Sequence, residues 1–205
     1  MAKIFKLGFV LLVITAVTGL ILGGVYTLTL EPIRIAKEKE KMEALAATLP
    51  GAAEFKQLEV ENDPTGIIKE VNEGSKDGEV LGYNITVTPK GYGGPVEVVV
   101  GIANDGLVKG IKILSHEETP GLGAKAAAQP FMGQFEDKKA ALFAVTKNPP
   151  ASDEEISAIS GATITSSAVV TGVNTAVRYW RSRIMGEGGA GGLDELDGLS
   201  GASAQ

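Results

Sequence analysis

An uncharged, largely apolar run from Leu7 to Leu30 constrains this chain more than any other feature of its sequence. As a helix it would be roughly 36 Å long, because each residue adds about 1.5 Å, whereas the hydrocarbon core of a bilayer is ~30 Å thick. The alternative is a cleaved signal peptide, but its apolar core is usually about 7–15 residues long, and no small-x-small cleavage site follows here. We therefore expect residues 1–30 to form a permanent single-pass transmembrane anchor.

Basic residues lie on both sides of this run, and their distribution leaves its orientation in the membrane open. Lys3 and Lys6 precede the run, whereas Arg34 and three lysines follow it, and the cytoplasmic side usually carries the excess of positive charge. Pro32 then suits the first turn of a second helix, where a backbone N–H has no partner in any case. We expect residues 31–50 to form a juxtamembrane helix; a solvated charged linker is the alternative.

The composition excludes several classes of function. The chain has no cysteine, which excludes thiolate catalysis and cysteine-ligated iron–sulfur or zinc sites. It has a single histidine, His116, so a histidine-rich metal site cannot be built from this chain alone, and we expect no metal site. The net charge is -6 and no basic patch follows the amino-terminal segment, so we do not expect a nucleic-acid partner.

Alternating apolar and polar residues predict several strands after the juxtamembrane segment, since this pattern is typical of a sheet with one buried face. The expected strands are 67–71, 80–88, 96–103 and 107–114, and the segment 72–78 is rich in turn formers. The sequence Asn104-Asp105-Gly106 predicts a tight hairpin between the last two strands. An antiparallel sheet with helices before and after it gives the chain an α+β fold.

Two later segments are expected to be helical. Apolar residues at spacings of three and four between Val169 and Trp180 predict an amphipathic helix. The alanine-rich segment that continues to Phe143 also looks helical and packed in the core. The last residues, 186–205, are glycine-rich and acidic, and we predict a disordered tail because they lack the apolar content of a folded segment. The globular domain is therefore expected to span residues 51–185.

A short polar motif, Ser160-Gly161-Ala162-Thr163-Ile164-Thr165-Ser166, leads directly into the predicted helix. Serine and threonine commonly cap helix N-termini, and composition alone favours this capping interpretation. The alternative is a phosphate site, because a helix N-terminus has unpaired N–H groups and about half a positive charge. Gly161 would let the backbone bend tightly or approach a ligand.

Two further motifs predict loops. One is His116-Glu117-Glu118-Thr119-Pro120-Gly121-Leu122-Gly123, directly after the last predicted strand, and the other is Gly91-Tyr92-Gly93-Gly94-Pro95. Loops at strand ends often bind ligands, and the glycines could line a cleft by close backbone approach. For the loop that contains His116, the alternative is a turn whose charges are simply solvated.

These three motifs, in this order behind an amino-terminal anchor, resemble the G subunits of the Rnf complex, a membrane-bound ion-translocating oxidoreductase. The C subunits of sodium-pumping quinone reductases are similar around the last motif, and both groups belong to the FMN-binding domain family. The resemblance covers nearly the whole chain. It implies a single transmembrane helix followed by an FMN-binding domain in which helices flank an antiparallel sheet.

The resemblance also implies a covalent flavin. In this family the threonine that ends the S/T-G-A-T motif carries FMN through a phosphoester, and Thr163 holds that position; Thr165 is the second candidate. Ser157 stands where the family commonly has an aspartate. Glu118 and Thr119 are expected to make polar contacts to the flavin ring. The other cofactor-binding residues expected from the resemblance are Ser160, Gly161, Ala162, His116, Gly121, Leu122, Gly123 and Gly93.

The implied function is that of an electron-transfer subunit in a complex that links ferredoxin and NAD to the movement of sodium ions or protons. No residue of the chain is expected to act as a catalytic acid or base, because the flavin would do the redox chemistry. The implied partners are the other Rnf subunits and a flavin transferase, with the amino terminus in the cytoplasm and the domain outside it. The alternatives are a C-type subunit of a quinone reductase, a cofactor-free membrane-anchored binding or assembly module, and a free-standing extracellular flavin reductase.

Overall fold

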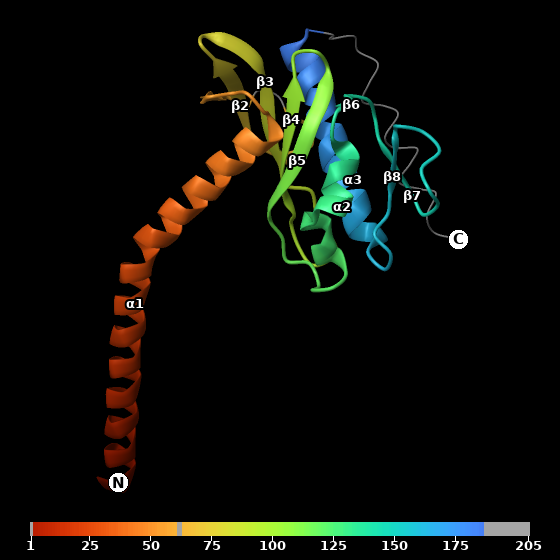
Figure 1. Ribbon diagram of the computed structural model, residues 1–205. Helices are drawn as coiled ribbons and strands as arrows, with labels where there is room; N and C mark the ends of the chain where they lie inside the picture. The colour runs from red at the N-terminus through yellow and green to blue at the C-terminus, as the bar shows by residue number, and fades with distance from the viewer. Residues whose placement is uncertain (1, 61–62, 187–205) are drawn as a thin grey trace. The chain divides into compact units, whose positions relative to one another are not determined.

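The computed structural model describes residues 2–60 and 63–186, and the chain divides into two compact units, Met1–Glu43 and Ala44–Gln205. The described residues of the first unit are helical, and the second unit contains a sheet with helices packed on it (Figure 1). Of the predicted tail 186–205, only Gly186 lies within the described residues.

Helix α1 spans Ala2–Thr48 and continues through Pro32 without a break. We expected a second helix to begin at Pro32, and this part of the prediction is wrong. A proline inside a helix removes one backbone hydrogen bond, but the helix continues past it here. Ion pairs of Arg34 with Glu31 (2.7 Å) and with Glu38 (3.1 Å) connect neighbouring turns around this position. The assignment of residues 31–50 to a juxtamembrane segment stays a prediction.

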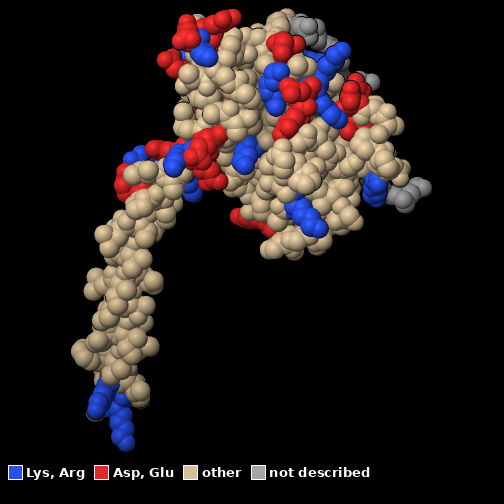
Figure 2. All heavy atoms as spheres, in the orientation of Figure 1, with Lys and Arg blue, Asp and Glu red and all other residues tan. Residues whose placement is uncertain are grey.

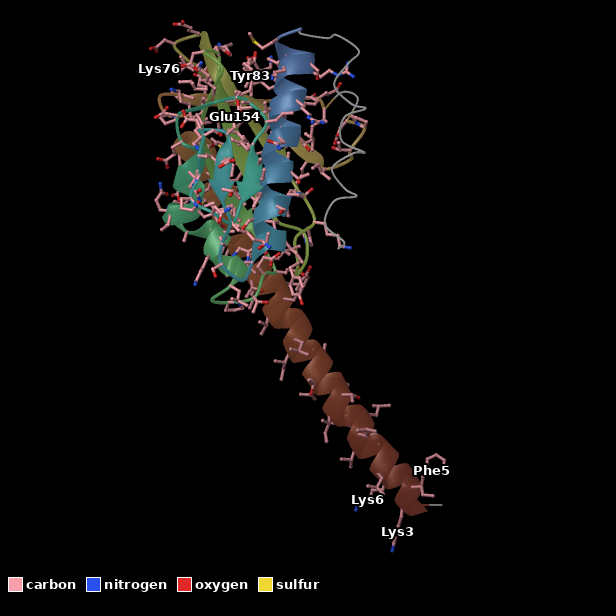
Figure 3. All side chains as sticks on the ribbon, turned by 90° about the vertical axis from the view of Figure 1, so that its right-hand side faces the viewer. Lys3, Phe5, Lys6, Lys76, Tyr83 and Glu154 are labelled. Atoms are coloured by element: carbon pink, nitrogen blue, oxygen red, sulfur yellow. The ribbon has the colours of Figure 1, made fainter. Side chains whose placement is uncertain are left out.

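The apolar part of α1 is a candidate membrane span by its length and composition. Its side chains are exposed along the helix, as at Phe9 (67%) and Leu20 (77%). Figure 2 shows no charged side chain between the lysines at its amino-terminal end and the charged turns farther along. Lys3, Phe5 and Lys6 project from the first turns of the helix (Figure 3).

The main sheet has six strands in the order β1-β2-β3-β4-β5-β6, and every neighbouring pair is antiparallel. The four expected strands are confirmed. The turn expected over 72–78 is shorter than predicted, because β2 continues to Lys76 and only Asp77 and Gly78 turn, both with positive φ. The strands are β1 (Glu54–Leu58), β2 (Ile68–Lys76), β3 (Glu79–Val87), β4 (Glu97–Ala103), β5 (Leu107–Ser115) and β6 (Lys138–Lys139).

Helix α3 (Thr163–Tyr179) packs on one face of this sheet and confirms the predicted amphipathic helix. Its apolar stripe and the alternate apolar residues of the strands form the main core, in which Val173, Ile85 and Val100 are fully buried. Gly172 allows the close approach to the end of β3, since a Cβ there would lie 3.0 Å from Val87 Cγ2 and 2.9 Å from Pro89 Cγ. A π-helical turn, η3 (Trp180–Ile184), follows α3.

The opposite face of the sheet is covered by the last residues of α1, from Ala44 onward, which belong to the second unit. Leu45 and Leu49 are each 1% exposed. Gly101 makes room for this contact, because a Cβ there would lie only 1.9 Å from the carbonyl oxygen of Thr48. Asn84 donates hydrogen bonds from Nδ2 to Leu45 O (3.2 Å) and Thr48 Oγ1 (2.6 Å).

The alanine-rich segment is only partly helical, which corrects the sequence prediction. It forms three short helices, η1 (Gly123–Ala127), α2 (Gln129–Met132) and η2 (Gly133–Phe135), and then passes into β6. Strand β7 (Ala144–Thr146) next pairs in parallel with β8 (Glu155–Ser157) in a separate two-stranded sheet. The expected core position of the aromatics is confirmed, since Phe131, Phe135 and Phe143 are buried and pack edge to face.

Candidate functional site

The three sequence motifs meet at the amino-terminal end of α3. The loop before β4 and the loop after β5 lie at the same end of the sheet as the start of this helix (Figure 1). Glu118, from the loop after β5, connects them. Its side chain is 6% exposed and hydrogen bonds to both other motifs. Residues that are 26 and 47 positions apart in sequence are thus held at one point.

The carboxylate of Glu118 accepts three hydrogen bonds. Oε1 accepts from the backbone N–H groups of Tyr92 (2.8 Å) and Gly93 (3.2 Å), and Oε2 accepts from the hydroxyl of Thr165 (2.8 Å). All three partners are neutral donors, and an ionised carboxylate offers only acceptors. The arrangement therefore matches a charged carboxylate held by dipoles.

The glycines of these motifs let the backbone approach the acidic loop closely. A Cβ at Gly91 would lie 2.1 Å from Glu118 Oε1, and one at Gly123 would lie 2.4 Å from Glu118 Oε2. At Gly93 a Cβ would lie 2.1 Å from the carbonyl oxygen of Glu117. Real Cβ atoms do not tolerate such distances. These glycines thus serve the packing of one motif against another.

Helix α3 begins at Thr163 without a side-chain cap. The residue before it, Ala162, makes no capping hydrogen bond, so the capping interpretation is wrong for this helix. Ser166 instead accepts from Ile159 N (3.0 Å) and donates to Ala162 O (3.0 Å), which ties the first turn to the preceding segment. Ser160 and Gly161 are exposed just before the helix. The first N–H groups of α3 are therefore not capped by a side chain.

The two candidate threonines have different environments. Thr165 is 1% exposed, and its hydroxyl donates to Glu118. Thr163 is half-buried, and its hydroxyl forms no hydrogen bond to any residue in the described part of the chain. Of the two hydroxyls, that of Thr163 is the one open to modification.

Each of the three motifs also contributes one exposed large apolar side chain. Tyr92 (71% exposed), Leu122 (45%) and Ile164 (58%), which we call the apolar patch, come from the three different motifs. A Cβ at Gly161 would lie 3.2 Å from Leu122 Cδ2, so the Leu122 side chain lies against the motif that begins at Ser160. Among the described residues of the second unit, only Leu142 and Met185 are other large apolar side chains with comparable exposure. The patch marks a surface that could cover a flat aromatic ligand.

Sequence reasoning missed Tyr92 and Ile164 as candidate contacts, although both carried a signal. Ile164 lies off the apolar stripe that begins at Val169, so a buried role in α3 did not explain it. Tyr92 is a large aromatic residue inside a glycine-rich loop, where the chain has no core to fill.

The remaining predicted residues shape the loop after β5. His116 Nδ1 accepts from the backbone N–H of Glu118 (3.3 Å). The carbonyl oxygen of Thr119 accepts hydrogen bonds from Leu122 N and Ala124 N (3.2 Å each), and the side chain of Thr119 is exposed. Gly121 has a φ of 80°, which favours glycine. The contacts expected from Glu118 and Thr119 to a flavin ring stay predictions.

Ser157, at the position of the family's usual aspartate, is the last residue of β8. Its backbone N–H donates to Gln134 Oε1 (2.7 Å), and Gln134 Nε2 donates to its carbonyl oxygen (3.4 Å). The side-chain amide of Gln134 thus fixes the strand that leads into the motif beginning at Ser160.

Two clefts lie at the opposite end of α3. One of about 290 Å³ is lined by Tyr179, Ser182 and Arg183 among others, and one of about 420 Å³ lies beside Trp180 and Arg181. Neither contains a residue of the three motifs. The candidate site at Thr163 combines a hydroxyl that has no partner among the described residues, an uncapped helix start and the apolar patch.

Comparison with known proteins gives both a family and a fold for this chain. Residues 91–178 match the family model described as an FMN-binding domain, and this range contains all three motifs. The chain is also similar in fold to the crystal structure of the C subunit of the Na(+)-translocating NADH-quinone reductase from Parabacteroides distasonis. That similarity has a TM-score of 0.54 at 23% identity and covers 70% of this chain and 89% of that one.

Curated relatives match over most of their length, and all three described here are G subunits of oxidoreductase complexes. The chain is 38% identical to that of the Na(+)-translocating ferredoxin:NAD(+) oxidoreductase complex of Acetobacterium woodii, over 87% of this chain and 92% of that protein. It is 34% identical to that of the ion-translocating oxidoreductase complex of Methanosarcina acetivorans, over 86% and 94%. It is 41% identical to that of the proton-translocating ferredoxin:NAD(+) oxidoreductase complex of Clostridium ljungdahlii, over 63% and 76%.

Proposed function

The chain belongs to the family of G subunits of ion-translocating oxidoreductase complexes, the Rnf complexes, and from this premise we propose that Thr163 carries FMN through a phosphoester. As a member of this family it is an electron-transfer subunit of an ion-translocating ferredoxin:NAD oxidoreductase, and the other subunits of that complex are its partners. The match to an FMN-binding domain favours this function over a cofactor-free assembly module.

The burial and hydrogen bonding of the Thr163 and Thr165 hydroxyls are the observations on which the choice of Thr163 rests. Thr165 is buried and donates to Glu118, whereas Thr163 is half-buried and has no partner among the described residues. Attachment at Thr165 would break that hydrogen bond and would require room beneath the surface. Attachment at Thr163 would break no hydrogen bond among the described residues and would need no room beneath the surface.

The start of α3 also supports a phosphate at this position. A phosphoester on the first residue of the helix lies beside N–H groups that no side chain caps. The helix dipole would stabilise the phosphate charge by roughly 0.3–1 kcal/mol. The capping residue, Ala162, has no side-chain oxygen that would compete for these donors.

The apolar patch of Tyr92, Leu122 and Ile164 supports a role in holding the flavin ring. Bound FMN supplies the redox chemistry, and the protein supplies position and electrostatics. The phosphoester would fix one end of the cofactor, while exposed apolar surface on three motifs would cover part of the ring. The ring would then stay near the surface, where electrons can pass between it and another protein of the complex.

The experiment that tests the proposal measures covalent flavin on full-length protein from a host that has a flavin transferase. We expect the denatured chain to fluoresce as flavin on a gel and to gain the mass of FMN less water. Thr163→Val should abolish both signals, and Thr165→Val should keep them. Loss of the flavin in Thr165→Val but not in Thr163→Val would assign the attachment to Thr165. Bare polypeptide from the natural host would contradict the proposal altogether.

We also propose that the second unit lies outside the cytoplasm, as the family resemblance implies. The absence of cysteine makes the test specific, since any introduced thiol is the only one. With Lys147→Cys, an exposed position outside all three motifs, a membrane-impermeant maleimide should label intact cells. With Lys3→Cys, at the start of α1, labelling should require permeabilised cells. The reverse pattern would invert the topology.

A further inference from the structure

We propose that the buried carboxylate of Glu118 lowers the midpoint potential of the flavin, as a fixed negative charge without a cationic partner. This inference rests on the proposed attachment of FMN at Thr163. It gives Glu118 a positioning and electrostatic role through the protein, in place of the direct ring contact expected from the sequence.

The charge of Glu118 is held by dipoles alone. Its side chain is 6% exposed, and its partners are two backbone N–H groups and the hydroxyl of Thr165. No lysine or arginine in the described ranges 2–60 and 63–186 forms an ion pair with it. Dipolar donors stabilise a carboxylate but leave its net charge in place.

The carboxylate contacts a group at, or next in sequence to, each member of the apolar patch. The N–H group of Tyr92 binds Oε1, and Thr165, which binds Oε2, is the neighbour of Ile164. Gly123, next to Leu122, approaches so closely that its Cβ position would lie 2.4 Å from Oε2. Each member of the patch is thus at most one residue away from a group that touches the carboxylate.

A negative charge in this position opposes reduction of a ring that lies on the patch. Reduction adds electrons to the flavin, and the interaction between like charges is stronger in a protein interior than in water. The other charged or titratable groups of these loops are Glu117, Lys90, Lys125 and Tyr92, which are exposed and therefore screened by solvent, and His116, which is half-buried. Among these groups Glu118 is the buried carboxylate.

The test compares two isosteric changes of charge at adjacent residues in full-length, flavin-loaded protein. In Glu118→Gln, the side-chain carbonyl can still accept from Tyr92 N and Gly93 N, and its amide can hydrogen bond to Thr165. Spectroelectrochemical titration should give a more positive midpoint potential for Glu118→Gln than for the unmodified chain. Glu117→Gln removes the same charge from an exposed position and should shift the potential much less.

A second variant covers the case in which Glu118→Gln does not fold or does not acquire flavin. Thr165→Val keeps the charge and removes one of its three donors, so the potential should become more negative. An unchanged or more positive potential in Thr165→Val would overturn the inference, and so would equal shifts in Glu118→Gln and Glu117→Gln. The failure of the underlying proposal looks different, because the unmodified chain would then carry no covalent flavin and have no potential to compare.

Discussion

The polar side chains around Glu118 and those beneath the end of α1 are both buried, but only the first group is fully paired. Glu118, Thr165 and Ser166 all have hydrogen-bond partners. On the other face of the sheet, Asn72 Nδ2, Asn84 Oδ1 and Thr86 Oγ1 are buried and have no partner among the described residues. These three side chains form one row, since Asn72 lies opposite Asn84 in register and Thr86 is two residues along the same strand.

The difference follows from what each group holds in place. At Glu118 a single carboxylate joins three loops, and every donor around it is needed to keep a buried charge stable. Beneath α1, Asn84 already holds the helix end through Leu45 O and Thr48 Oγ1, and its remaining oxygen adds nothing to that contact. A buried water bound to this row of side chains would give its unpaired polar atoms a hydrogen-bond partner. The comparison thus separates the polar group around Glu118, which the site requires, from the row beneath α1, which costs stability. Mutations can test this difference.

The largest effect is expected for Glu118→Ala. This change leaves the N–H groups of Tyr92 and Gly93 and the hydroxyl of Thr165 without their acceptor, at about 1–3 kcal/mol for each donor that water cannot reach. We expect a loss of roughly 3–5 kcal/mol in the free energy of unfolding. The single tryptophan, Trp180, is 5% exposed, so its fluorescence reports urea unfolding of the full chain in detergent. A loss below about 1 kcal/mol would show that the carboxylate does not hold the loops together.

The next effect concerns the other face of the sheet. In Gly101→Ala the new methyl group would lie 1.9 Å from Thr48 O, so the end of α1 must move. We expect a loss of about 2–3 kcal/mol. Gly110→Ala is the matched control, because Gly110 pairs with Gly101 across β4 and β5 and the nearest atom to its Cβ position is 3.9 Å away. Equal losses in both variants would mean that strand geometry, and not the contact with α1, is responsible.

Thr165→Val should have a smaller effect that again acts on the Glu118 group. It removes one hydrogen bond to a carboxylate, which is worth about 1.5–3 kcal/mol. The control is Thr171→Val, at an exposed position on the same helix, which should change stability by less than about 0.5 kcal/mol. Because Glu118 and Thr165 are in contact, the losses in Glu118→Ala and Thr165→Val should not add in the double mutant.

Sequence periodicity predicted the long elements of the fold, because each of them carries a one-sided apolar pattern. Strands β3, β4 and β5 and helix α3 were found in this way. Strands β6, β7 and β8 have at most three residues, which is too short for a repeating pattern. The alanine-rich segment looked like one helix because alanine favours helices. In the structure, Pro130 opens a four-residue helix and Gly133 follows it, so the helical segments stay short.

The candidate site was predicted as three motifs, but not as one hydrogen-bonded group. The contact between Glu118 and Thr165 joins residues 47 positions apart, and no local pattern reports such a pair. The glycines were expected to approach a ligand, whereas Gly91 and Gly123 approach the carboxylate of Glu118. Our proposal distinguishes Thr163 from Thr165 by burial, and burial at the first turn of a helix depends on the loops that pack against it.

The smallest predicted effect has the opposite sign and tests the unpaired row directly. Thr86→Val replaces a buried hydroxyl that has no partner among the described residues with a methyl group of similar size. Since the hydroxyl loses its hydrogen bonds to water on folding, we expect a gain of about 1 kcal/mol in the free energy of unfolding. Thr88→Val, two residues along the chain, is the control, because Thr88 Oγ1 donates to Ile67 O (3.2 Å) and its removal should destabilise the domain. A loss of stability in both variants would mean that Thr86 does have a partner, and a buried water that joins it to Asn84 would then be expected in an experimental structure.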